Sequence, residues 1–324
     1  MAREQQCPAA RAVPVDYEPD LVEEAVFRCV AASGHTAAYY VAREAAYAVA
    51  DDDEREAAFR RLHLQWFAHL DLGEPLRRAL DELPLLAHHV ERCVARRARS
   101  PGDEGADLLV RPAAADNASS PRAARGAIVV GMRPDLLRDR AALLYFLRHE
   151  LLHVADMLDP AFGYESSLPH AEGGPTHDRL LMERYRALWA ATIDGRLVRR
   201  GHAPDGTRER RLRDFSRTFA LPDGAARRLL SRFFDRQPST HADLVAAARD
   251  PGRAAGSPGT RRCAICGFSG PSSGPVAAVS PVVSARIRAD FPRWRPEDGL
   301  CPQCAELYRT RDLSDAALRA LPRA

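Results

Sequence analysis

The chain has 324 residues, of which 46 % are hydrophobic, so it is long enough for two or three domains with a sizeable core. Its formal net charge is only +3, which does not by itself indicate nucleic-acid binding, and every basic residue is Arg. No apolar stretch reaches the ~18 residues that a membrane span needs, and residues 1–15 lack the apolar core of a secretory signal. These features, with a composition typical of a GC-rich genome, predict a cytoplasmic bacterial protein.

The N-terminal third of the chain has a helical pattern. Residues 1–17 are expected to be a loose tail, and residues 18–100 form the predicted N-terminal helical region. Apolar residues in this region recur at spacings of three and four, which is the period of an amphipathic helix. Its five histidines are scattered, so we expect surface or core-edge positions for them rather than a metal site.

The central part of the chain alternates a strand with long helices. A loop rich in Pro, Gly and Ala precedes Gly126–Met132, which is the strongest strand candidate. Asp139 can cap a helix from Arg140 to Leu158, and a second long helix is predicted from Thr176 to about Arg200. This order favours an α+β metallohydrolase, which we place at residues 101–255. In such enzymes an edge strand beside the site can pair with an extended peptide.

The most informative motif lies inside the first of these helices. Residues 149–153 read His-Glu-Leu-Leu-His within a long apolar run. His149 and His153 are four residues apart, so they project from one helical face and are close enough to bind one Zn²⁺. Glu150 is then placed to accept a proton from water that the metal activates. The motif predicts a zinc hydrolase with Glu150 as the general base.

A catalytic zinc needs a third protein ligand and an open position for water. Glu183 and Asp194 on the second helix are eleven residues apart, and at 100° per residue both fall on one face, with small residues between them. Asp159 occupies the position of the third ligand in metzincins, but Asp156 replaces the glycine of that group. Two further candidate ligands lie in the connecting region, His170 and His177. Donors to a developing oxyanion could be Tyr164, His170 or His177.

The segment Leu-Trp-Ala-Ala-Thr-Ile-Asp at residues 188–194, together with the motif at 149–153, resembles a known family. It is similar to the predicted bacterial metallopeptidase domains that are associated with von Willebrand A and MoxR-type ATPase proteins. The resemblance covers about 50 residues, and Ala190 stands where that family has Asn. It implies that Asp194 is the third zinc ligand beside His149 and His153, with Glu183 as the alternative.

The C-terminal segment, residues 256–324, is predicted to be a zinc ribbon or treble-clef module. Its four cysteines form two C-x-x-C pairs, Cys263 with Cys266 and Cys301 with Cys304. Two such pairs can bind a tetrahedral Zn²⁺ between them, and a site with four thiolates is closed and therefore structural. Between the pairs we expect an insertion, residues 269–298, and after Cys304 a helix start.

The chain is therefore predicted to be α+β and mostly helical, with a zincin-like core, a short sheet and the zinc ribbon. The predicted function is a zinc-dependent metallopeptidase that hydrolyses a peptide or another amide bond and holds one catalytic and one structural Zn²⁺. The alternative is an inactive zincin-like binding protein whose ribbon contacts nucleic acid or a protein partner. Because all basic residues are Arg, a solvated basic face is favoured over a nucleic-acid site.

Overall fold

The computed structural model divides the chain into two compact units, Met1–Pro160 (unit 1) and Ala161–Ala324 (unit 2). It describes residues 12–110, 126–171, 175–219, 221, 223–236, 239–256, 261–266, 269–270 and 279–320. The predicted catalytic domain, residues 101–255, spans the end of unit 1 and the beginning of unit 2. No helix among the described residues is long and apolar enough to cross a membrane.

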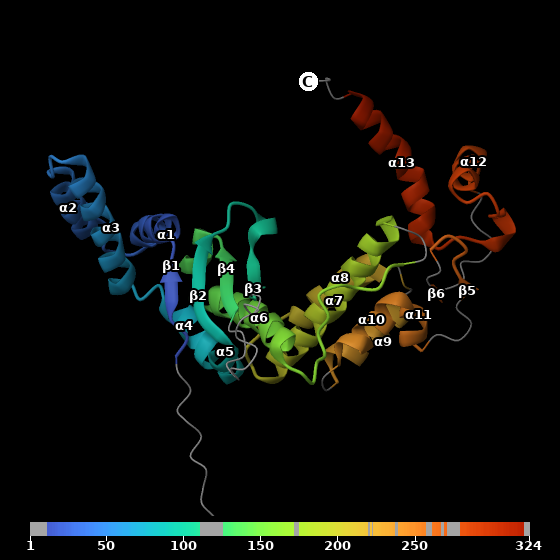
Figure 1. The fold of residues 1–324 in the computed structure, drawn as a ribbon, viewed down its shortest axis with the longest axis horizontal. Coiled ribbons are helices and arrows are strands. Elements are labelled where there is room, and N and C mark those ends of the chain that lie inside the picture. Colours follow the sequence, from blue (N-terminus) through green and yellow to red (C-terminus); the bar gives the residue numbers. More distant parts are fainter. Residues whose placement is uncertain are drawn as a thin grey trace, which may run out of the picture. The chain divides into compact units, whose positions relative to one another are not determined.

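Unit 1 is built on a four-stranded sheet with the order β1-β2-β4-β3 (Figure 1). Its strands are β1 Val15–Tyr17, β2 Val90–Arg97, β3 Gly105–Leu109 and β4 Gly126–Met132. Strands β1, β2 and β4 run parallel to one another, whereas β3 pairs antiparallel with β4 at the edge. The predicted strand at residues 126–132 is confirmed.

Two of the predicted elements near this sheet differ from the structure. The helical pattern expected as far as Arg99 ends earlier, because Val90–Arg97 form strand β2. Residues 15–17 of the expected tail form strand β1. The cause is long-range pairing: β2 is hydrogen-bonded on both sides, to β1 and to β4, and its Cys93 and Ala95 are fully buried on one face of the sheet.

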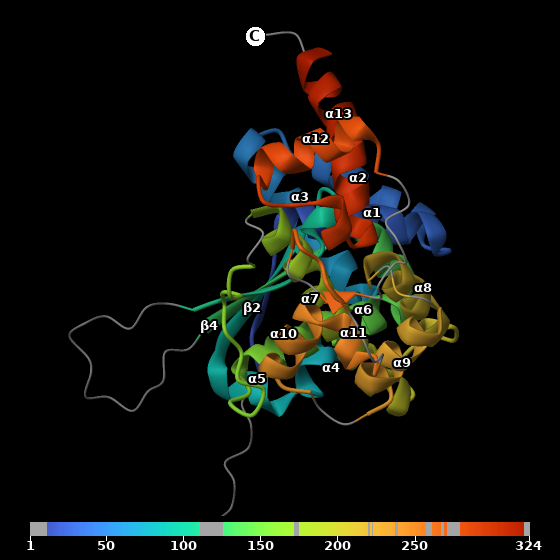
Figure 2. The ribbon, with the colours of Figure 1, turned by 90° about the vertical axis from the view of Figure 1, so that its right-hand side faces the viewer.

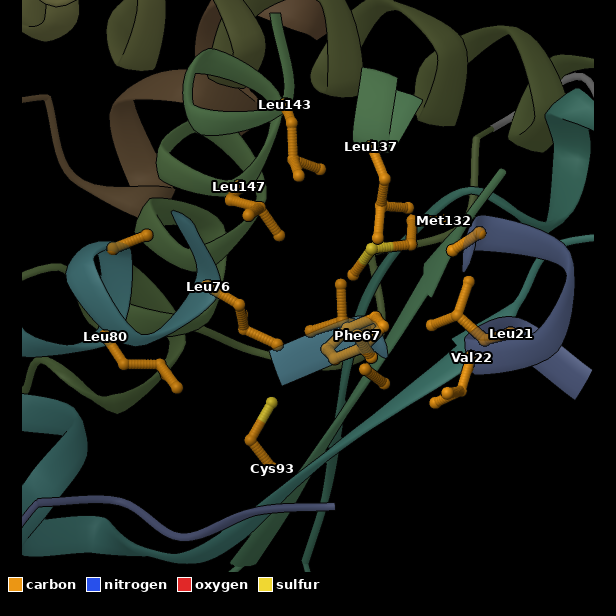
Figure 3. Packing of buried hydrophobic residues seen from close by; sticks show 14 of the residues in the cluster. Leu21, Val22, Phe67, Leu76, Leu80, Cys93, Met132, Leu137, Leu143 and Leu147 are labelled. Atoms are coloured by element: carbon orange, nitrogen blue, oxygen red, sulfur yellow. The ribbon is translucent and has the colours of Figure 1, made fainter. Parts of the chain in front are cut away.

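Helices cover that face of the sheet and close a hydrophobic core (Figure 3). The helices of unit 1 are α1 Pro19–Ala32, α2 Thr36–Tyr47, α3 Asp52–His69, α4 Glu74–Asp81, α5 Pro84–His89 and α6 Arg140–Leu158, with 3₁₀ turns η1 Pro101–Asp103 and η3 Pro134–Arg138. Leu21 of α1, Phe67 of α3 and Leu76 of α4 belong to this core, as do Leu143 and Leu147 of α6. The sheet and its helices are thus held together mainly by apolar burial.

Helix α6 begins and ends where the sequence predicts. The Asp139 side chain accepts hydrogen bonds from the backbone N–H groups of Ala141 and Ala142, both at 3.0 Å, and so satisfies two donors at the helix start. Within the helix, Leu143, Leu147 and Leu151 are buried at intervals of four residues. This apolar stripe fixes the rotation of α6 about its own axis.

Unit 2 is a helical bundle followed by a cysteine-containing segment (Figure 2). Its bundle helices are α7 Pro175–Arg199, α8 Thr207–Phe219, α9 Asp223–Phe234, α10 His241–Arg249 and α11 Pro251–Ala254. The segment that follows contains β5 Arg261–Arg262, β6 Ser269–Gly270, α12 Pro281–Asp290, the 3₁₀ turn η4 Pro296–Asp298 and α13 Pro302–Ala320. Helix α7 packs against α8, α9 and α10 and is therefore the central helix of the bundle.

Close packing of α7 on α9 depends on Gly195. A Cβ atom added at this position would lie 1.9 Å from the carbonyl oxygen of Phe234, the last residue of α9. Gly195 is buried inside the helix, so only a residue without a side chain permits this approach.

We expect Gly195→Ala to lower the free energy of unfolding by about 1–3 kcal/mol, because the added methyl group meets backbone that cannot easily move. Chemical denaturation followed by circular dichroism measures this loss. Gly224→Ala is the matched control: it also replaces a helical glycine, but its Cβ would make only an ordinary contact, 3.6 Å from Arg228 Nη1. The control should be neutral or slightly stabilising, and equal losses in the two variants would contradict the packing argument.

A buried Tyr–His pair lies beside α7. Nδ1 of His241, the first residue of α10, shares a hydrogen bond of 2.8 Å with the Tyr185 hydroxyl, and the Tyr185 ring packs against both His241 and Trp189. Burial lowers the pKa of His241 below its ordinary value of 6.5. The folded protein therefore holds His241 neutral under conditions in which the unfolded chain would protonate it.

Because the unfolded state binds more protons, His241 contributes stability above pH 6.5 that is lost as the pH falls below that value. We expect the free energy of unfolding of His241→Gln to change less between pH 6.5 and pH 5 than that of the wild type. Tyr185→Phe removes the hydrogen bond and keeps the histidine, so it should retain the wild-type slope. Denaturation curves at several pH values supply the measurement, and an unchanged slope in His241→Gln would exclude this histidine as the cause.

Candidate metal centres

Four buried cysteines of the two C-x-x-C pairs converge in unit 2. The sulfur atoms of Cys263, Cys266, Cys301 and Cys304 all lie within 4.8 Å of one another, and Cys266 Sγ is 3.8 Å from Cys301 Sγ. A tetrahedral site with Zn–S bonds of about 2.3 Å sets sulfur–sulfur distances of about 3.8 Å. The donor set and its spacing therefore fit zinc, and the predicted four-cysteine group is confirmed.

Local structure holds the two pairs in place. The first pair lies in the turn between β5 and β6, which pair antiparallel, and the second lies at the start of α13. The Cys301 backbone N–H donates to Cys263 Sγ over 3.3 Å, and the Cys304 N–H donates to Cys301 Sγ over 3.4 Å. The helix expected after Cys304 is present but begins earlier, at Pro302. Residues 271–278 of the expected insertion lie outside the described residues, and its described part contains α12 and η4.

The four sulfur atoms need a cation if all of them are to be ionised. Hydrogen bonding within the group, first with Cys266, lowers the pKa of the Cys263 thiol. The contact with Cys263 in turn raises the pKa of Cys304. One thiolate thus suppresses the ionisation of its neighbours, and a divalent metal would remove this conflict because it binds the deprotonated form of each ligand.

The His-Glu-Leu-Leu-His motif lies on α6 in unit 1. The ring centroids of His149 and His153 are 4.9 Å apart, and His149 is only 9 % exposed. His149 Nδ1 lies 3.0 Å from Glu150 Oε1. This contact engages Nδ1, so Nε2 is the nitrogen through which His149 would bind a metal.

An ion pair next to the motif anchors α6 to the end of α4. Arg148 Nε and Nη2 donate to the two carboxylate oxygens of Glu82 over 2.7 and 2.6 Å. Arg148 is buried, and a bidentate ion pair of this kind fixes the relative orientation of the two side chains as well as pairing their charges. The backbone that precedes His149 is therefore held in place.

Strand β3 lies against the general-base candidate. Gly105, at the start of β3, has φ +146°, and a Cβ atom built on it would lie 3.4 Å from Glu150 Oε2. Helix α6 contacts β3 directly. The Glu150 carboxylate thus lies close to the edge strand of the sheet, near Gly105.

A third zinc ligand is not found among the described residues of unit 1. In the described part of that unit, no further His, Cys, Asp or Glu joins His149 and His153 in a group close enough to share an ion. Asp156 is buried on α6, and Asp159 is the exposed C-cap of the same helix. The carboxylates favoured by the sequence, Asp194 and Glu183, both belong to α7 in unit 2.

The two α7 carboxylates have different surroundings. Asp194 is fully buried and accepts a hydrogen bond from Arg211 Nε over 2.5 Å, in an ion pair with α8. Glu183 is exposed, although a helical wheel puts it on the same face as Asp194. The role of either residue as a zinc ligand stays a prediction.

The candidates in the connecting region lie in three different surroundings. His170 is exposed and contacts Asp178 over 3.0 Å, whereas Tyr164 packs against Trp189. His177 is buried, and its Nε2 lies 3.5 Å from Cys304 Sγ. His177 is therefore part of the surroundings of the four-cysteine group, which its sequence position did not indicate.

Comparisons with known proteins give no relative: no family model matches the chain, and no match is found among curated proteins or solved structures. The resemblance drawn from the motif and from residues 188–194 therefore stays a prediction. What is known of the site comes from the geometry of the chain itself.

We expect Cys263→Ser/Cys266→Ser to lose one metal ion per chain relative to the wild type, because half of the ligands in a closed site are removed. Elemental analysis of the purified full-length protein measures the loss. Cys29→Ala is the matched control, since Cys29 is a buried thiol of unit 1 outside the group. Loss of metal in the control, or retention in the double variant, would show that these four cysteines do not bind the ion.

Proposed function

We propose that the protein is a zinc-dependent metallopeptidase-like hydrolase that cleaves a peptide or another amide bond. One observation carries the proposal: His149 and His153 lie with their rings 4.9 Å apart on a single helix, with Glu150 between them in sequence and against the edge strand β3. A helix that used this segment only for packing would have no need of two adjacent imidazoles and a carboxylate at the sheet edge.

His149 and His153 would bind the catalytic zinc. Asp194 as the third ligand, with Glu183 as the alternative, stays a prediction from the sequence. When bound, zinc lowers the pKa of water towards 7 and polarises the substrate carbonyl. Glu150 accepts the proton of the attacking water and later delivers it to the leaving amine. The contact between Glu150 and His149 Nδ1 orients both groups before substrate binds.

The edge of β3 supports a peptide as the substrate. Within the described residues, β3 pairs on one side only, with β4, so its other edge offers backbone N–H and C=O groups. An extended peptide could add to this edge as a further strand, with main-chain hydrogen bonds placing its scissile carbonyl. Because Glu150 contacts the start of β3 at Gly105, such a peptide would run past the general base.

The structural zinc is a second part of the proposal. We assign it to Cys263, Cys266, Cys301 and Cys304, because their sulfurs are close enough to share one ion, and four thiolate ligands would leave no open position for water. This site would stabilise unit 2 and take no part in the hydrolysis.

We expect about two zinc ions per wild-type chain and about one in His149→Ala/His153→Ala, because only the second site depends on these imidazoles. Glu150→Gln keeps the ligands and should retain both ions. Against a mixture of unstructured peptides, its cleavage rate should fall by at least ~10²-fold, since the proton acceptor is lost.

Mass spectrometry of the peptide mixture detects cleavage at any peptide bond, whatever the sequence preference of the enzyme. One zinc in both the wild type and the double variant would refute the catalytic site and favour a binding protein. Wild-type cleavage by Glu150→Gln would refute the assigned role of Glu150 and leave the metal site standing.

A further inference from the structure

Helix α7 contacts the second cysteine pair at two points on one face. His177 Nε2 lies 3.5 Å from Cys304 Sγ, and seven residues (about two turns) later Arg184 hydrogen-bonds through Nη2 to the Gln303 side-chain oxygen. Gln303 lies inside the pair, between Cys301 and Cys304, and its Nε2 donates to the Thr218 carbonyl of α8 over 2.6 Å. The metal-binding turn is thus bonded to the helical bundle.

Both α7 residues are withdrawn from solvent. His177 is 4 % exposed and Arg184 is 3 % exposed, which makes Arg184 the most buried arginine in the described part of the chain. Burying a guanidinium is costly unless a negative charge compensates it. Burial lowers the pKa of Arg184, and negative charge on the four cysteine sulfurs opposes this effect.

The charge of the metal centre explains why a cation is buried there. Four thiolates around one Zn²⁺ carry a net charge of −2, and the four cysteines are themselves buried. His177 does not belong to the group of atoms that could share the ion, so it acts on a sulfur rather than on the metal. A neutral imidazole can donate one N–H bond to Cys304, while Arg184 supplies a permanent positive charge.

We propose that His177 and Arg184 are positioning residues of the zinc centre: Arg184 neutralises part of the tetrathiolate charge, and His177 Nε2–H donates to the Cys304 thiolate. The zinc centre is then completed by α7, and its affinity for metal depends on a helix of the bundle. This inference rests on the structural zinc assigned above and is independent of any peptidase activity.

The proposal predicts that replacing Arg184 affects the zinc form and the metal-free form differently. In the zinc form the sulfurs are thiolates, so Arg184 is stabilised by them. In the metal-free form some of the sulfurs take up protons, so the buried guanidinium loses part of that compensation. Replacement of Arg184 by an apolar side chain should therefore weaken zinc binding without destabilising the metal-free protein.

The experiment uses the full-length chain with His149→Ala/His153→Ala, so that only the cysteine site takes up zinc. Competition with a chromophoric chelator gives the zinc Kd. Arg184→Met should raise the Kd by roughly 10- to 100-fold, as is usual when a partner of the ligands is lost. Arg184→Lys should recover part of the affinity because it restores the charge. Arg186→Met, an exposed arginine two residues along α7, is the matched control and should leave the Kd unchanged.

Cobalt substitution tests His177 separately. Co²⁺ in a four-thiolate site gives a sulfur-to-metal charge-transfer band, and loss of the N–H donor makes Cys304 a better electron donor to the metal. His177→Phe should therefore shift this band to lower energy while the intensity typical of four thiolates is retained. An unchanged spectrum would show that His177 only fills space.

Thermal unfolding of the metal-free and zinc-loaded forms distinguishes this role from simple packing. An unchanged zinc Kd in Arg184→Met, with equal losses of stability in both forms, would overturn the proposal. If the parent chain with four intact cysteines bound no zinc at all, the structural site itself would fail and this inference with it. That outcome is visible by elemental analysis and does not affect the test of Glu150.

Discussion

One face of helix α6 is buried in the hydrophobic core of unit 1, and this burial fixes where the other side chains of the helix point. Leu143, Leu147 and Leu151 enter the core at intervals of four residues, and at 100° per residue His149 and His153 must then point away from it. Glu150 lies between these two directions, where it meets the start of β3. The hydrophobic stripe thus determines the placement of the imidazoles and the carboxylate, and the Arg148–Glu82 ion pair adds a link between α6 and the end of α4.

Local signals allowed a large part of the structure to be predicted from the sequence. Asp139 as a cap and the apolar run behind it located α6 at both ends, and the β-branched segment at 126–132 located β4. The two C-x-x-C pairs predicted the cysteine group, because so few arrangements place four thiols at that spacing. In each case the predictive signal lies within about twenty residues of chain, or in a residue type, such as cysteine, that has few structural roles.

Contacts between distant segments were not predictable in the same way. Strand β2 follows helix α5 with a spacing of apolar residues, Leu86, Val90 and Cys93, that is also compatible with a continuing helix. Pairing with β1 and β4 on either side makes this segment a strand, and neither partner is adjacent to it in sequence. Likewise, nothing in the sequence around His177 or Arg184 indicates contact with the second cysteine pair, more than a hundred residues later.

That separation along the chain has a consequence for the order of folding. The contacts of α7 with the second cysteine pair join residues 127 and 119 positions apart, whereas α7 meets α8 and α9 through much shorter loops. Segments close in sequence find one another first, because a long loop costs more entropy to close. The bundle of α7, α8 and α9 should therefore assemble early, before α7 has formed its contacts with the second cysteine pair. Metal binding by the cysteines would then be the last step in the folding of unit 2. The supply of metal in the cell would set how long the incompletely folded unit is exposed to chaperones and proteases.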